Sequence, residues 1–94
     1  MHFLVITLLA LESATVIDVR QDSRTTLAIQ VGGVIYTAEF SRHALKPESL
    51  REGEQVLADV KDGKMTVLRK DGKRATARII RVQRVPVYPH SESN

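Results

Sequence analysis

The three histidines are the first residues to test for chemistry, because imidazole can ligate metals and act as a general base near neutral pH. They stand at His2, His43 and His90, in three separate segments of the 94-residue chain. These separations do not match the short ligand spacings of zinc sites, and the chain has no cysteine to supply thiolates. We therefore expect no metal and no other cofactor. His43 follows Arg42 in a polar stretch and is the histidine that merits a closer look.

Carboxylates and serines likewise predict no catalytic centre. A general acid–base pair needs two carboxyls held a few ångströms apart in contrasting environments. The acidic side chains of the central region are scattered instead, at Glu39, Glu48, Glu52, Glu54 and Asp59. No serine lies in a G-x-S-x-G nucleophile motif, and no helical pattern follows the Gly-Gly pair to make it a phosphate loop. The sequence therefore predicts a protein that is not an enzyme.

Basic residues form the pattern that does predict a binding site. The formal net charge is +3, and between residues 61 and 84 the acidic residues are Asp62 and Asp71 alone. Such an excess of cations can attract an anionic partner, for example nucleic acid or another acidic polymer. The candidate anion- or nucleic-acid-binding residues are Lys61, Lys64, Lys70, Lys73, Arg74 and Arg78. A second explanation stays open, because cations at sheet margins also block unwanted strand pairing.

These cations lie in residues 56–85, which we expect to form a three-stranded antiparallel meander. The tetrapeptide Lys-Asp-Gly-Lys occurs twice, at 61–64 and 70–73, each time between runs rich in aliphatic and β-branched residues. Asp-Gly between such runs favours a β-hairpin, because Asp tolerates and Gly favours positive φ. A two-residue turn at Asp62-Gly63 would pair Val60 with Met65 and Ala58 with Val67.

The second turn fits better as a three-residue loop, Lys70-Asp71-Gly72, with Gly72 in the left-handed conformation. A two-residue turn would place Arg69 opposite Arg74, and opposed like charges are unfavourable. The three-residue loop instead pairs Val67 with Ala75. The apolar face is then predicted to comprise Val56, Ala58, Val60, Met65, Val67, Ala75, Ala77 and Ile79. The opposite face carries Asp59, Thr66 and Thr76 together with the cations. Leu57, Leu68 and Ile80 lie among them, so we expect this face to be partly covered.

The preceding half of the chain predicts three more strands, at residues 14–20, 25–31 and 34–40. A tight turn at Gly32-Gly33 would set Val31 opposite Val34, and alternation then marks one face of a half-buried hairpin. That face would carry Leu27, Ile29, Val31, Val34, Tyr36, Ala38 and Phe40. Residues 41–55 break the pattern and form a crossover, in which Pro47 can open one helical turn.

The chain divides into an apolar segment at 1–13, a β-domain at 14–85 and a proline-containing tail at 86–94. The segment is too short for the ~20 residues of a membrane-spanning helix. It could be an export remnant or a first folded element; we favour export, and thus a periplasmic over a cytoplasmic location. Against this, cleavage after Ala14 would leave Glu12 where a small residue is expected. Weak membrane association through this segment is a further hypothesis.

Six short strands in two hairpin groups, joined by a crossover loop, predict an all-β fold. We expect a small antiparallel barrel of five to six strands, SH3-like or OB-like, because closure removes exposed sheet edges. A two-sheet β-sandwich is the alternative.

Two pieces of the chain, Val31 to Phe40 and Gly53 to Lys73, make up about a third of its residues. Their spacing resembles small uncharacterised exported bacterial β-domain proteins, which pair a VGxxxYTAxF-like hairpin with a VGDxVxVRVEKxxMYLKRPDGK-like meander. The matching positions are mostly turn and core residues. The resemblance implies an exported domain and no known activity.

Three functions are consistent with these observations. The first is a non-catalytic β-barrel that serves as a binding or interaction module of the bacterial cell envelope, contacting a protein or an anionic polymer. The second is a nucleic-acid-binding barrel that uses the basic meander, helped by Tyr36 or Phe40. The third is a structural module that oligomerises through a sheet edge or through the apolar N-terminal segment.

Overall fold

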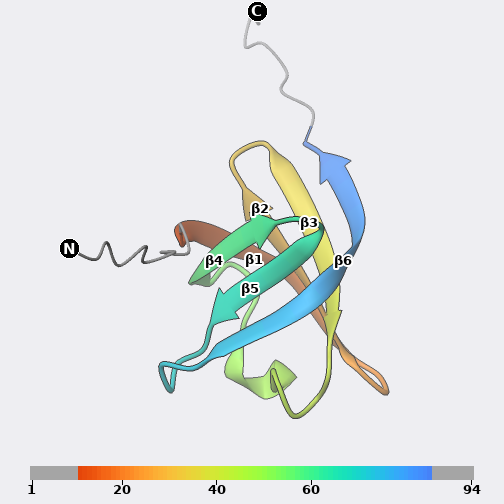
Figure 1. Cartoon of the computed structure of the whole chain (residues 1–94), viewed down its shortest axis with the longest axis vertical. Coiled ribbons are helices and arrows are strands. Elements are labelled where there is room, and N and C mark those ends of the chain that lie inside the picture. Colours follow the sequence, from red (N-terminus) through yellow and green to blue (C-terminus); the bar gives the residue numbers. More distant parts are fainter. Residues whose placement is uncertain (1–10, 86–94) are drawn as a thin grey trace, which may run out of the picture.

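The computed structural model describes residues 11–85, which form a closed six-stranded antiparallel β-barrel (Figure 1). Around the barrel the strands follow the order β1-β2-β3-β6-β5-β4, and β4 pairs with β1 to close it. The elements are β1 (Glu12–Gln21), β2 (Thr25–Val31), β3 (Val34–Phe40), a 3-10 turn η1 (Pro47–Ser49), β4 (Gln55–Lys61), β5 (Lys64–Leu68) and β6 (Arg74–Arg84). The predicted small barrel is confirmed. The sandwich alternative is wrong, because the β1–β4 and β3–β6 pairings join the two hairpin groups on both sides.

The predicted registers of both hairpin groups are confirmed. Val31 pairs with Val34 across the Gly-Gly turn, and Val60 pairs with Met65 across the Asp-Gly turn. Met65 also pairs with Ala77. The inner faces meet in one core, which includes Ala14, Val16, Leu27, Ile29, Ala38, Phe40, Ala58, Met65, Val67 and Ala75. Each register follows from the rule that a one-residue slip would turn every core side chain to the outside.

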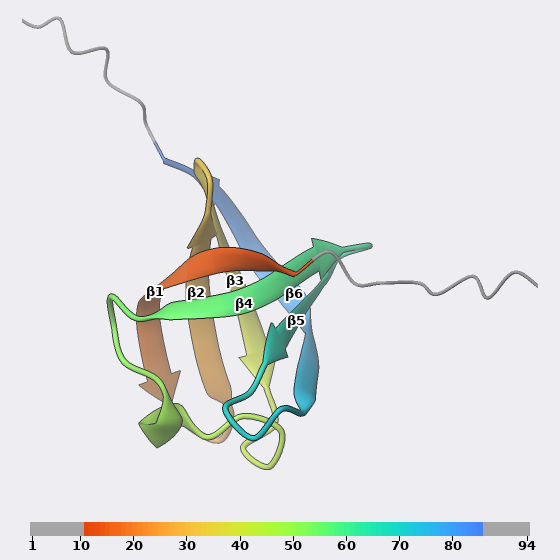
Figure 2. The same ribbon diagram turned by 90° about the vertical axis from the view of Figure 1, so that its left-hand side faces the viewer.

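The crossover between β3 and β4 caps one end of the barrel. Figure 2 shows this connection and η1 together below the strands. The predicted helical turn forms with Pro47 at its start. Leu45 and Leu50 are buried in the core, and the buried Thr25 hydroxyl donates to the Leu45 carbonyl at 2.8 Å. The crossover thus contributes core side chains that the alternating pattern of the strands did not indicate.

Two β-bulges bend the barrel. In β1 the register against β2 shifts between Val16 and Asp18, so Ile17 is the extra residue. In β6 it shifts between Ile79 and Arg81, so Ile80 is the extra residue. An extra residue in a strand re-aims the side chains on either side of it. Val19, beyond the first bulge, can therefore pack against the core, whereas simple alternation from Val16 would have placed Asp18 there.

The outer face differs from one expectation. Leu57, Leu68 and Ile80 were expected to be partly covered, but Leu57 is 44% and Ile80 53% exposed, so the prediction is wrong for these two. Leu68 is half-buried. Among residues 11–85 no element crosses the outer side of the meander, because the crossover packs against the end of the barrel instead.

The predicted terminal segments fall mostly outside the described residues, which exclude 1–10 and 86–94. β1 begins at Glu12, earlier than the predicted strand start at residue 14. Glu12, Ser13 and Ala14 pair with β4, and Ala14 is 1% exposed. Cleavage after Ala14 would therefore remove part of the β1–β4 closure. Among residues 11–85 no helix has the length and apolarity needed to cross a membrane.

Candidate functional site

The six predicted binding residues separate into two groups at opposite ends of the short strand β5. Lys61, Lys64 and Arg78 lie at one end, where Lys61 pairs with Lys64 and Lys64 pairs with Arg78. Lys70, Lys73 and Arg74 lie at the other end, in and after the β5–β6 loop. The structure therefore does not bring all six residues to one place.

The first group, which we call the cation row, consists of Lys61, Lys64 and Arg78. Asp62 and Gly63 have φ values of 54° and 73°, as a tight hairpin turn of this type requires, and this turn sets the two lysines opposite each other. All three side chains are exposed on the outer face, since the neighbouring side chains of Met65 and Ala77 face inward. Directly opposed side chains stand about 5 Å apart at Cβ, so three like charges in a row repel one another.

In the described part of the chain, ion pairing does not offset this repulsion. Within residues 11–85, the ion pairs are Arg20–Asp18, Arg69–Asp71 and Lys70–Glu54. None of them includes a member of the cation row. The row is consequently a positive surface that can attract an anion without first breaking an ion pair.

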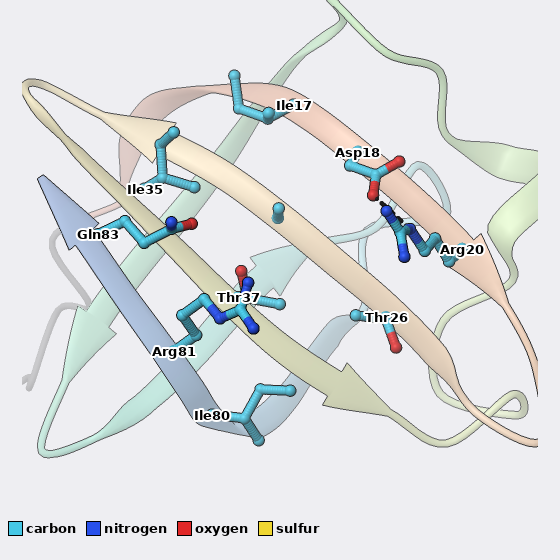
Figure 3. Close-up of a pocket in the computed structure, with 10 residues that line it drawn as sticks. Ile17, Asp18, Arg20, Thr26, Ile35, Thr37, Ile80, Arg81 and Gln83 are labelled. Carbon is cyan, nitrogen blue, oxygen red and sulfur yellow. Dashed lines mark hydrogen bonds and ion pairs between the residues drawn. The ribbon is translucent and has the colours of Figure 1, made fainter. Parts of the chain in front are cut away.

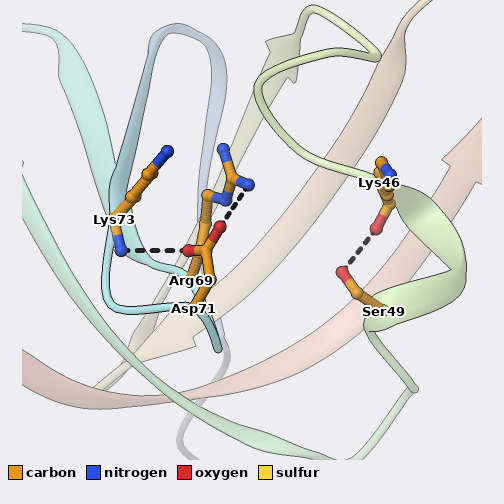
Figure 4. Close-up of polar contacts among 5 residues, drawn as sticks. All are labelled: Lys46, Ser49, Arg69, Asp71 and Lys73. Atoms are coloured by element: carbon orange, nitrogen blue, oxygen red, sulfur yellow. Dashed lines mark hydrogen bonds and ion pairs between the residues drawn. The ribbon is translucent and has the colours of Figure 1, made fainter.

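In the second group, Lys70 forms an ion pair with Glu54, whereas the Lys73 and Arg74 side chains form none within residues 11–85. The loop that carries Lys70 and Lys73 is held by local polar contacts (Figure 4). Asp71 accepts hydrogen bonds from the Lys73 backbone N–H at 3.0 Å and from the Arg69 guanidinium. The Lys73 hydrogen bond and the Arg69 charge keep the pKa of Asp71 below its usual range. The charges of Arg69 and Asp71 therefore stabilise the loop conformation.

Lys70 ties the β5–β6 loop to the crossover. Its Nζ lies 3.1 Å from Glu54 Oε2, and the Arg51 backbone N–H donates to Glu54 Oε1 at 2.9 Å. The Arg51 hydrogen bond, followed by the Lys70 contact, lowers the pKa of Glu54. A ligand would have to compete with Glu54 for Lys70, whereas Lys61 and Lys64 require no such exchange.

Strand β6 adds two cations that the sequence did not single out, Arg81 and Arg84. The strand reads RATARIIRVQR and contains four arginines and no acidic residue. None of these arginines forms an ion pair within the described part of the chain. The signal was present in the sequence as an acid-free stretch. The position of these arginines follows from the pairing of residues 79–84 with β3, which the sequence alone does not indicate.

A groove of about 400 Å³ lies beside β6 on the outer face of β1, β2, β3 and β6 (Figure 3). Its lining includes Ile17, Ala28, Ile35, Thr37, Ile80, Arg81 and Gln83. Paired residues run across its floor, from Asp18 to Ala28, then to Thr37 and Arg81. The small side chains of Ala28 and Thr37 leave space at the centre.

Both bulges place an aliphatic side chain in this groove. Ile17 from β1 and Ile80 from β6 are the extra residues of their strands, and both line it. Arg20 lies at the β1 side and is bonded to Asp18 at 2.8 Å, whereas Arg81 comes from β6. The groove thus combines aliphatic contact surface with a guanidinium that makes no ion pair among residues 11–85.

His43, Tyr36 and Phe40, which the sequence analysis also considered, do not line the groove. His43 is exposed beside Arg42 and Lys46 at the crossover. In residues 11–85 no three His, Asp or Glu side chains gather so as to hold a metal ion. Phe40 is 1% exposed in the core, and Tyr36 packs against the same core, so neither lies among the groove residues. Base stacking on these two aromatics is therefore not available at the groove.

Comparison of the chain with models of protein families, with curated proteins and with solved structures found no match in any of the three. The resemblance to exported β-domain proteins stays a hypothesis based on the residues quoted for it.

Proposed function

We propose that this protein is a non-catalytic β-barrel module that binds an anionic polymer along β6. The observation that carries the proposal is the arrangement of cations on this strand. Arg78 belongs to the cation row, and Arg81, three residues further on, lines the groove. A polymer that contacts Lys64 and Arg78 can continue over the bulge at Ile80 to Arg81.

The repulsion within the cation row supports a binding role over a purely solubilising one. Isolated cations suffice to keep a surface soluble, and opposing them across neighbouring strands costs stability. Sites that break a local stability rule are often functional. Nucleic acid and acidic polysaccharide both supply closely spaced negative charges, and the Ile17 and Ile80 side chains could contact their apolar faces.

The proposal is tested by fluorescence anisotropy with a labelled single-stranded oligonucleotide and, separately, a labelled uronate polysaccharide. Affinity for either polymer should fall steeply with salt, because binding releases condensed counterions. For the oligonucleotide, Arg78→Gln and Arg81→Gln should each reduce the slope of log affinity against log salt by about 0.7. Arg42→Gln removes the same charge from the exposed crossover and should leave the slope unchanged.

Two results would contradict the proposal. One is the absence of binding to both polymers at about 50 mM salt, where phosphate contacts are strong. The other is an equal loss from all three variants, which would indicate attraction to net charge alone. Binding to one polymer but not to the other would decide between nucleic acid and polysaccharide.

The cell-envelope location is a separate hypothesis, motivated by the uncharged residues before Glu12. If the native protein is processed on export, its mature N-terminus should lie at or before Glu12, because β1–β4 pairing starts there. Sequencing of the mature N-terminus checks this. A mature chain starting at Thr15 would show that Glu12 to Ala14 are dispensable for closure.

A further inference from the structure

The last part of β6 pairs with a neighbouring strand on one side only. Residues 74–78 pair with β5, and the final contact on that side is the bond from the Ile79 N–H to the Gly63 carbonyl at 2.8 Å. From Ile79 to Arg84 the strand pairs with β3. Figure 2 shows β6 continuing past the β4–β5 hairpin, which points in another direction. Within the described chain, this stretch is a sheet edge that barrel closure does not remove.

The direction of the backbone groups follows from one hydrogen bond. The Val85 N–H donates to the Gly33 carbonyl at 2.8 Å, so Val85 directs its backbone groups toward β3. Hydrogen-bonded and non-hydrogen-bonded pairs alternate along an antiparallel ladder. Gln83 and Arg81 therefore direct their backbone N–H and C=O groups toward β3, where they pair with Ile35 and Thr37. Val82 and Arg84 direct their N–H and C=O groups to the open side.

The side chains at this edge define the chemistry that would fit it. Val82 is 59% exposed, although it follows the bulge in a strand whose inner face builds the core. Arg81, Gln83 and Arg84 are exposed as well. A strand lying beside this edge would therefore meet one aliphatic and two cationic side chains, and no acidic one.

We propose that the edge at Val82 and Arg84 accepts an extended acidic segment of a partner protein, which pairs with β6 as an additional strand. Addition of a strand to an open edge draws affinity from backbone hydrogen bonds and specificity from alternate side chains. The fitting segment has acidic residues opposite Arg81 and Arg84 and an aliphatic residue opposite Val82. This site goes beyond the polymer-binding surface, because it uses backbone groups that the polymer does not need.

A second copy of this chain is the less suitable occupant. Pairing two β6 edges would bring two sets of Arg78, Arg81 and Arg84 together with no acidic residue in either strand. Like charges opposed across strands are destabilising, and cations on an edge strand act against self-association. The same cations attract an acidic strand.

The test uses the full-length protein and a synthetic peptide of about six residues with the pattern Glu-Thr-Val-Glu at its centre, whose valine lies opposite Val82 when the peptide pairs antiparallel to β6. Amide hydrogen exchange is followed by NMR with and without the peptide. Without it, the Val82 and Arg84 amides should exchange faster than Gln83, whose N–H bonds to β3. With the peptide, the exchange rates of the Val82 and Arg84 amides should fall by a factor of up to about ten, while the exchange rate of Gln83 should change little.

A matched pair of proline substitutions separates edge pairing from charge attraction. Val82→Pro removes an N–H that points to the open side, a position where strands tolerate proline. It should abolish peptide binding while polymer binding persists. Gln83→Pro removes an N–H that bonds to β3 and should destabilise the barrel. If Val82→Pro does not fold, Arg84→Glu keeps the backbone intact and should lose peptide binding by itself.

Several results would overturn the inference. These are no peptide binding at millimolar concentration, binding that slows no edge amide, or equal binding by folded Val82→Pro. Protection of Val82 and Arg84 that rises with protein concentration in the absence of peptide would identify a second copy as the occupant instead. Lys64→Glu should weaken polymer binding and leave peptide binding unchanged, so failure of one proposal can be distinguished from failure of the other.

Discussion

The tetrapeptide Lys-Asp-Gly-Lys occurs at 61–64 and at 70–73, and the two copies have different structures. In the first copy, Asp62 and Gly63 both have positive φ, and the two lysines oppose each other without an ion pair among residues 11–85. In the second copy, Gly72 has a φ of 87°, and Lys70 pairs with Glu54. Four identical residues thus give an uncompensated cation pair in one place and a bonded loop in the other.

The flanking residues explain this difference. A two-residue turn at the first copy aligns Val60 with Met65, so both face the core. The same turn at the second copy would oppose Arg69 and Arg74. The three-residue loop avoids this and instead lets the Arg69 N–H bond to the Lys73 carbonyl at 2.7 Å. Core alignment, acting over several residues, determines which turn a shared tetrapeptide adopts.

The largest expected effect comes from the turn glycines. Gly72→Val should destabilise the protein by about 1–3 kcal/mol, because a β-branched residue resists positive φ. No atom lies within 4 Å of a Cβ built at Gly72, so the cost comes from the backbone and not from a clash. Each kcal/mol corresponds to about 4–8 °C in Tm for a domain of this size.

Thermal unfolding checks this prediction, with Lys73→Ala as the control in the same loop. Lys73→Ala keeps the backbone N–H that Asp71 uses and should cost far less. Equal midpoints for the two variants would show that the left-handed conformation at Gly72 is not required.

The next effect distinguishes the two aspartates. Asp71→Asn should lower Tm more than Asp62→Asn, because Asp71 bonds to the Lys73 N–H and to Arg69. No side-chain hydrogen bond involves Asp62 within the described residues. Asparagine also tolerates positive φ, so the comparison isolates charge and bonding at both sites. A larger loss of Tm for Asp62→Asn would contradict the conclusion that the aspartate of the second copy makes the stabilising contacts.

Acid should remove the stability that the Asp71 and Glu54 carboxylates contribute through their contacts with the second copy. The folded-state pKa values of Asp71 and Glu54 are lowered relative to 3.8 and 4.5. Lowered carboxyl pKa values contribute stability that is complete above the unfolded values and is lost as pH falls through the folded ones. The Tm difference between the wild type and Asp71→Asn should therefore be constant near neutral pH and shrink below about pH 4. A Tm difference that stays constant down to about pH 2 would contradict the role of the Asp71 carboxylate.

The smallest effect has the opposite sign. Lys64→Gln should stabilise the barrel by about 0.2–0.5 kcal/mol, because it relieves repulsion from Lys61 and Arg78. The same change should weaken polymer binding. Lys73→Gln, at the corresponding position of the second copy, should alter neither property much. Denaturant unfolding and the anisotropy assay measure the two effects, and a destabilised Lys64→Gln would show that the row is not repulsive.

Local rules were sufficient to predict the strands and their registers. The Asp-Gly and Gly-Gly turns, together with alternation, placed Met65 opposite Val60 and Tyr36 opposite Ile29 as observed. The groove could not be predicted in this way, because it needs two bulges in strands far apart in the sequence. The adjacent aliphatics Val16-Ile17 and Ile79-Ile80 do break the alternation, but a break alone does not say which residue turns outward.

Features that depend on closure of the barrel could also not be predicted from the sequence. Lys70 meets Glu54 only because the crossover packs against the end of the barrel, so the pairing of these two residues has no local signal. Arg81 and Arg84 were not among the candidate residues, because the sequence does not indicate which strand pairs with the end of β6. Its continuation along β3 brings them beside the groove and to the open edge.

The sharing of β6 between β5 and β3 has a consequence for the order of folding. The β2–β3 and β4–β5 hairpins and the β5–β6 pairing link residues close in sequence, so they can form early. The β1–β4 and β3–β6 pairings span the crossover and must wait for the ends of a longer loop to meet. Doubling a flexible loop costs only about 0.6 kcal/mol. Lengthening the crossover should therefore slow folding only slightly.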